Sequence, residues 1–166
     1  MAKYNFKEIP SSDKNQIQTL SDECMSCLER KEFFIPLSQM DVDNLFNKDY
    51  GINIGAYHDN TLVGMATLYV DQNERSFTRN HLSLSNKEKI CQLGNYLVSK
   101  DHRGQGIIRT LQTKLIDLAK GMKFDYAVAT AHPQNLASVN TLLKELDIVD
   151  TIDYKGYSRH LFVKKL

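Results

Sequence analysis

One segment, residues 97–108 (LVSKDHRGQGII), constrains the fold of this chain more than any other. It begins with the apolar pair Leu97 and Val98, which predicts the end of a strand. A polar turn follows, and Gly104 and Gly106 then stand directly before a strongly amphipathic helix. Glycines allow a backbone to approach a ligand closely, and the first turn of a helix presents unpaired N–H groups with a partial positive charge. The segment therefore predicts a strand, a loop and a helix whose N-terminus binds phosphate.

The spacing of this segment excludes two common phosphate-binding motifs. A dinucleotide-binding loop needs a third glycine three residues after Gly106, where this chain has Arg109. A nucleoside triphosphate loop needs Gly-Lys followed by Ser or Thr, and the sequence contains no such run. A plain strand–helix turn that happens to contain glycines remains the alternative.

A second segment, residues 129–138 (ATAHPQNLAS), follows the same order of strand, turn and helix. The apolar run at 124–131 predicts a buried strand, and Pro133 separates it from an amphipathic helix that opens at Asn135. On the residues alone, a helix N-cap explains Asn135 better than a ligand contact does.

The two segments together resemble those of the GNAT acetyltransferases, a superfamily that transfers an acyl group from coenzyme A to an amine. Its motif A, Arg/Gln-x-x-Gly-x-Gly/Ala, matches residues 103–108 except at the last position, which is Ile108. Positions 108, 111, 115, 118 and 122 form an apolar helical stripe, so we expect Ile108 to point inward. The second segment is similar to the family pattern His-Pro-x-Asn-x-x-Ser/Ala, which places the pantetheine contact on Asn135 with Ser138 beside it.

The resemblance implies acetyl-CoA as cofactor and a backbone N–H near residues 96–98 as the donor to the oxyanion. The implied cofactor-binding residues are Tyr96, Leu97, Val98, Arg103, Gly104, Gln105, Gly106, Ile107, Ile108, Arg109, Asn135 and Ser138. No metal is expected.

The tyrosine that serves as the catalytic acid in many family members is absent, because this chain has Thr141-Leu142-Leu143 at that place in the helix. Tyr154 and Tyr157 are the candidate replacements, and packing or surface aromatics on strands are the alternative. The candidates for a base or an amine contact are His132, Asp71 and Glu74. The alternative for His132 is that it orders the turn, and the alternative for Asp71 and Glu74 is that they are solvated surface carboxylates.

The resemblance also implies the fold, a mixed α/β (α+β) GNAT-like sheet in the order β-α-α-β-β-β-α-β-α-β-β. Two neighbouring parallel strands, ending at Val98 and Ala131, are expected to separate and admit the cofactor. The predicted strands are 4–9, 52–58, 61–70, 90–98, 124–131, 147–153 and 157–163. The predicted helices are 11–31, 39–47, 106–121 and 135–146, with a long loop at 71–89.

Composition sets the broad class. The 166 residues, 42% hydrophobic and 25% charged, predict a single globular domain spanning residues 1–166. The 21 basic and 20 acidic residues give no net field that would favour nucleic acid or anionic lipid. No signal peptide or membrane span is recognisable, so a cytoplasmic location is expected. Three cysteines argue against a disulfide framework, and Cys24 and Cys27 are expected to be buried on one helix face.

The leading hypothesis is therefore an acetyl-CoA-dependent N-acetyltransferase that acts on a primary amine of a small molecule or a peptide, with a homodimer as one option. A non-catalytic acyl-CoA sensor with the same fold is the first alternative. A binding module for another phosphorylated ligand is the second.

Overall fold

The computed structural model describes residues 3–154 and 156–166 of the chain. The strands are β1 (Asn5–Glu8), β2 (Gly51–His58), β3 (Thr61–Tyr69), β4 (Ile90–Val98), β5 (Tyr126–Ala131), β6 (Asp147–Tyr154) and β7 (Tyr157–Lys165). The α-helices are α1 (Lys14–Ser26), α2 (Gln39–Asn44), α3 (Ser76–His81), α4 (Ile107–Gly121) and α5 (Leu136–Leu142). The mixed α/β fold with this order of strands confirms the predicted class.

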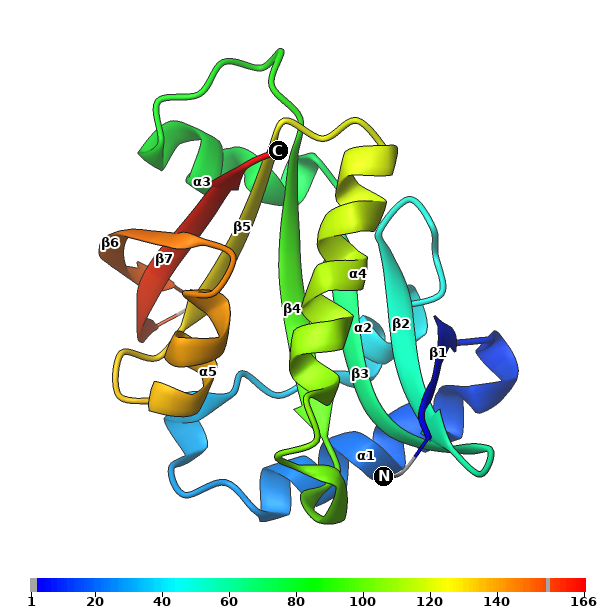
Figure 1. The fold of residues 1–166 in the computed structure, drawn as a ribbon. Helices are drawn as coiled ribbons and strands as arrows, with labels where there is room; N and C mark the ends of the chain where they lie inside the picture. Colours follow the sequence, from blue (N-terminus) through cyan, green and yellow to red (C-terminus); the bar gives the residue numbers. More distant parts are fainter. Residues whose placement is uncertain (1–2, 155) are drawn as a thin grey trace.

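The strands form one sheet in the order β1-β2-β3-β4-β5-β7-β6 (Figure 1). Neighbouring strands are antiparallel except β4 and β5, which are parallel. Pairing between β4 and β5 runs from Ile90 opposite Tyr126 only to Gln92 opposite Val128, and the two strands then separate. The predicted separation of the strands that end at Val98 and Ala131 is confirmed.

Helices cover both faces of the sheet (Figure 1). Helix α4 packs its apolar side on one face, and α1 packs on the other. The fully buried positions of α4 include Ile107, Leu111 and Leu115, whereas Ile108 is only partly buried against the core. The buried stripe is therefore displaced by one residue from the predicted one at its start, and the expectation that Ile108 points inward is met in part.

The segment at 71–89, predicted as a loop, contains the short helix α3. Its buried residues are polar, Arg75, Thr78 and Arg79, so the helix has no apolar period that could reveal it. Helices α1 and α5 also end earlier than predicted, at Ser26 and Leu142.

The cysteine prediction is half correct. Cys24 is buried and its thiol donates to the carbonyl of Val98 at 3.4 Å, but Cys27 lies beyond the end of α1 and is exposed. Over the residues described, no helix is long and apolar enough to cross a membrane.

Candidate active site

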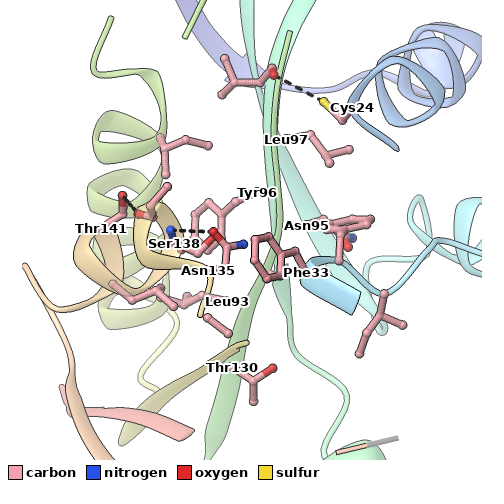
Figure 2. A pocket seen from close by; sticks show the side chains of 18 of the residues that line it. Cys24, Phe33, Leu93, Asn95, Tyr96, Leu97, Thr130, Asn135, Ser138 and Thr141 are labelled. Atoms are coloured by element: carbon pink, nitrogen blue, oxygen red, sulfur yellow. Dashed lines mark hydrogen bonds between the residues drawn. The ribbon is translucent and has the colours of Figure 1, made fainter. Parts of the chain in front are cut away.

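A cavity of about 800 Å³ lies where β4 and β5 separate. Its wall is formed by the loop before α4, the second half of β4, the end of β5 and α5. The end of α1, the segment between α1 and α2, Asp41 of α2, Tyr69 of β3, Arg75 directly before α3, and the strands β6 and β7 also contribute to it. Figure 2 shows side chains from β4, β5 and α5 turned toward this shared space. The strand separation therefore creates a site that elements distant in the sequence build together.

The glycine loop, residues 103–106 directly before α4, borders one part of this wall and has the conformation that an anion-binding site needs. Gly104 and Gly106 have φ angles of +75° and +76°, and a Cβ atom at either position would meet nothing within 4 Å. The space beside these two residues is therefore open, and only glycine adopts this backbone without strain.

The amides of the glycine loop are free to bind a ligand. The N–H of Arg103 donates to the carbonyl of Lys100 at 3.4 Å, whereas none of the amides from 104 to 109 donates to another group in the described chain. The first internal bond of the helix start runs from Thr110 to the carbonyl of Gly106. Free amides at the N-terminus of a 15-residue helix make a fitting site for a diphosphate.

The loop is held in place from the opposite face of the sheet. The carboxylate of Glu23 on α1 accepts hydrogen bonds from the Ser99 hydroxyl and the Lys100 amide, each at 2.8 Å. These two bonds, the amide first, lower the pKa of Glu23. Because β4 ends at this point, Glu23 fixes the direction in which the chain enters the glycine loop.

The middle of the cavity lies between β4 and α5 (Figure 2). Asn135 caps α5, since its side-chain oxygen accepts from the Ser138 amide at 3.3 Å. The N-cap interpretation of Asn135 is thus confirmed, and a contact with pantetheine stays a prediction for its remaining amide N–H groups. Opposite, the hydroxyl of Tyr96 is buried without a hydrogen-bond partner among the described residues, and burial raises its pKa.

A polar region of the wall contains residues that carry no sequence motif. The side chain of Asn95, at a φ of +52° in a bulge of β4, donates to the hydroxyls of Thr67 at 3.1 Å and Tyr69 at 2.6 Å. Burial raises the pKa of Tyr69, so its hydroxyl stays protonated at neutral pH. The same region includes Arg75 and Arg159, which are taken up below.

Most of the site residues predicted from the sequence meet at this cavity. Those that line it are Tyr96, Leu97, Val98, Arg103, Gly104, Gly106, Ile107, Ile108, Arg109, Asn135, Ser138 and Tyr154. Gln105 is exposed and does not line it, and neither does Tyr157.

Two of the three candidates for a base, His132 and Asp71, lie away from the cavity. His132 does not line the cavity, and its Nδ1 accepts from the Gln134 amide at 3.2 Å, which orders the turn. Asp71 does not line the cavity either. The side chain of Glu74 lies outside the described part of the structure. Two carboxylates that the sequence did not single out, Glu29 and Asp41, do line the cavity.

Comparison with solved structures shows the same architecture. NAA60 of Arabidopsis thaliana in complex with acetyl-CoA matches with a TM-score of 0.78 at 15% identity, covering 99% of this chain and 100% of that chain. An N-acetyltransferase from Staphylococcus aureus Mu50 matches with a TM-score of 0.76 at 16% identity and 99% coverage of both chains. The ribosomal-protein-alanine N-acetyltransferase from Brucella melitensis matches with a TM-score of 0.73 at 18% identity, covering 98% of this chain and 99% of that chain. At these identities the likeness shows the fold alone.

Comparison with protein sequences identifies the family. No curated protein matches this chain significantly. The model of the acetyltransferase (GNAT) family matches residues 15–147, which include both the glycine loop and the segment around Asn135. The chain therefore belongs to the GNAT acetyltransferase family.

Proposed function

We propose that this chain is an N-acetyltransferase that uses acetyl-CoA and transfers the acetyl group to a primary amine of a small molecule or a peptide. The observation that carries the proposal is the row of free amides from 104 to 109 at the start of α4. These amides border a cavity that runs along separated strands, as a long cofactor with a diphosphate requires. The acetyl-CoA complex of the similarly folded NAA60 supports the choice of cofactor.

The residues of the cavity fit the parts of this cofactor in order. The amides of the glycine loop would bind the diphosphate, with the guanidinium groups of Arg103 and Arg109 at the same edge of the cavity. Beyond Gln92, β4 has no strand partner on its β5 side, so its backbone groups can bind the amides of the pantetheine arm. The amide of Asn135 faces the same space.

For the chemistry, the bound cofactor supplies a thioester carbon for attack by the amine. A backbone N–H near residues 96–98 would stabilise the oxyanion. Tyr154 lines the cavity and remains the candidate donor to the leaving sulfur, while Tyr157 lies away from the cavity. Tyr69 is a further donor, because its hydroxyl accepts from Asn95 and no described group accepts its hydrogen. Its raised pKa makes it a hydrogen-bond donor rather than a full acid.

Titration with acetyl-CoA tests the cofactor. At a hundredfold excess over Kd, binding adds about 2.7 kcal/mol of stability, which for a chain of this length raises the melting temperature by about 5–10 °C. An unchanged melting temperature and no heat of binding at millimolar acetyl-CoA would reject the proposal.

A panel of amines with thiol release as readout tests the transfer. Tyr154→Phe should lower kcat, and Tyr157→Phe serves as the matched control because that ring does not line the cavity. Binding of the cofactor without turnover on any amine would support an acyl-CoA sensor instead.

A further inference from the structure

Two arginines in the wall of the cavity, Arg75 and Arg159, are almost completely buried. The two residues are 4% and 3% exposed, respectively, and both line the cavity. Arg159 comes from β7, and Arg75 stands at the N-terminus of α3. Neither belongs to the glycine loop, so neither is needed for the proposed diphosphate seat.

The two guanidinium groups lie on the same face of the sheet. Arg159 lies two residues before Leu161 on β7, so the two side chains are on the same face of the sheet. Leu161 packs with Ile90 and Val128 on the face away from α4. Arg75 donates a hydrogen bond to the side chain of Gln92, which lies two residues after Ile90 and therefore on that same face. Both positive charges therefore reach the cavity from the α3 side of the sheet.

Their hydrogen-bond partners are all uncharged. Arg159 donates to the carbonyls of Glu32 at 2.9 Å and Phe33 at 3.3 Å, and its Nε has no partner among the residues that the structure describes. Arg75 donates to the carbonyl of Asp71 at 3.3 Å and to the side-chain oxygen of Gln92. Within the described residues, no carboxylate forms an ion pair with either arginine.

A buried arginine normally has a charged partner. A guanidinium stays protonated in proteins and has five N–H donors, so an unpaired one is costly to bury. Burial lowers the pKa of Arg159, which reports this cost. Here each arginine uses two donors on neutral oxygens and keeps others free at a cavity wall. A carboxylate is the group that such a planar donor set binds best, often through two parallel bonds.

The carboxylates of the cavity wall do not take this role. Asp41 accepts from the backbone and hydroxyl of Ser38 in the capping box of α2, and Glu29 is exposed. Both line the cavity, where their carboxylates can interact with the positive charge of an amine. The wall thus offers complementary charges to a molecule that carries an amine and a carboxylate.

We infer that the acceptor of the proposed acetyl transfer is a free amino acid or a similar small amino-carboxylate, whose carboxylate is bound by Arg159, while Arg75 adds positive charge to the same cavity wall. This inference rests on the proposed function and names its substrate class. It favours such a molecule over the N-terminus of a peptide, in which the carboxylate beside the amine is replaced by an amide.

The test compares matched pairs of amines: amino acids with the amine at the α position or at the far end of the chain, each beside its carboxamide. In the wild-type protein, kcat/KM should be roughly ten- to a hundredfold higher for the carboxylate member of the accepted pair, the size of a charge-assisted hydrogen bond. Arg159→Gln and Arg75→Gln should each bring this ratio toward one while the affinity for acetyl-CoA is kept.

Arg79→Gln is the matched control. Arg79 is 8% exposed and also donates to neutral carbonyls, those of Ser85 and Glu88, but it does not line the cavity. Its loss should leave the carboxylate-to-carboxamide ratio unchanged. Because the ratio is taken within one variant, a general loss of folded protein cancels.

Equal kcat/KM for the two members of every accepted pair in the wild-type protein would overturn the inference, and so would a ratio that survives both Arg159→Gln and Arg75→Gln or falls equally in Arg79→Gln. In these cases acetyl transfer itself persists and the proposed function stands. Absence of transfer to every amine would instead reject the proposed function, and this inference with it.

Discussion

Replacing Gly106 by valine should separate the affinity for the cofactor from the stability of the fold. The residue has a φ of +76°, and a Cβ atom there would meet nothing within 4 Å. The fold therefore loses only the backbone term for a non-glycine residue in the left-handed region, about 1–2 kcal/mol and somewhat more for a β-branched side chain. For a chain of this length that corresponds to a fall in melting temperature of about 2–8 °C.

Gly106→Val should also weaken binding, by at least as much free energy, because the new side chain occupies the open space beside the free amides. Loss of one hydrogen bond to a charged group, about 1.5–3 kcal/mol, raises Kd roughly 10- to 150-fold. Isothermal titration calorimetry with acetyl-CoA measures this directly, and a thermal melt of the same sample measures the stability.

Gly156→Val is the matched control for this experiment. Gly156 has a φ of +81° and equally open space at its Cβ, but it lies in the turn between β6 and β7 and does not line the cavity. The control should lose similar stability and keep its Kd for acetyl-CoA. An unchanged Kd in Gly106→Val would show that the glycine loop is not the diphosphate seat. Equal losses of affinity in both variants would attribute the effect to backbone strain.

Three further predictions follow from contacts around the site. Asn135→Ala removes the acceptor for the Ser138 amide. This should cost about 1 kcal/mol of stability, which lowers the melting temperature by about 2–4 °C, and it should raise the Kd for acetyl-CoA no more than about tenfold. An unchanged melting temperature would contradict the role of Asn135 as the cap of α5. Glu23 has a pKa below its usual value of 4.5 when folded, so the unfolded chain binds more protons and the stabilisation, present above pH 4.5, is lost as the pH falls through the folded pKa. Glu23→Gln should therefore flatten acid unfolding in this range, and identical pH profiles would refute the role of this carboxylate. Gly64→Ala would place a Cβ atom 2.8 Å from Cγ2 of Ile107, so the first turn of α4 must shift; we expect weaker acetyl-CoA binding by calorimetry, and wild-type affinity would show that the turn tolerates the shift.

The elements that the sequence predicted well are those with a clear apolar pattern. Helix α4 was located to within a residue because its buried side chains recur at helical spacing. Strands β3 and β4 were located equally well because they are largely apolar runs bounded by polar segments. Helix α3 was missed because the described buried residues in it and directly before it, Arg75, Thr78 and Arg79, are all polar. A period of hydrophobicity cannot reveal a helix whose inward side chains are polar.

The residues of the candidate site that could be predicted are likewise those whose role depends on local sequence. The glycine loop and Asn135 could be found because their roles depend on neighbours within a few residues: a helix start, a turn and a cap. Tyr69, Asn95 and Arg159 could not, because each matters only through a partner far away in the sequence, such as the contact of Arg159 with the carbonyl of Phe33.

By itself the sequence determined the family resemblance, the strand–loop–helix that presents free amides, and the cap of the following helix, since local backbone geometry follows from residue type and spacing. Only the tertiary structure decided how far β4 and β5 pair before they separate, and which side chains face the resulting cavity. Strand register and the burial of unpaired charge are set by packing among residues distant in the chain, which no local pattern encodes.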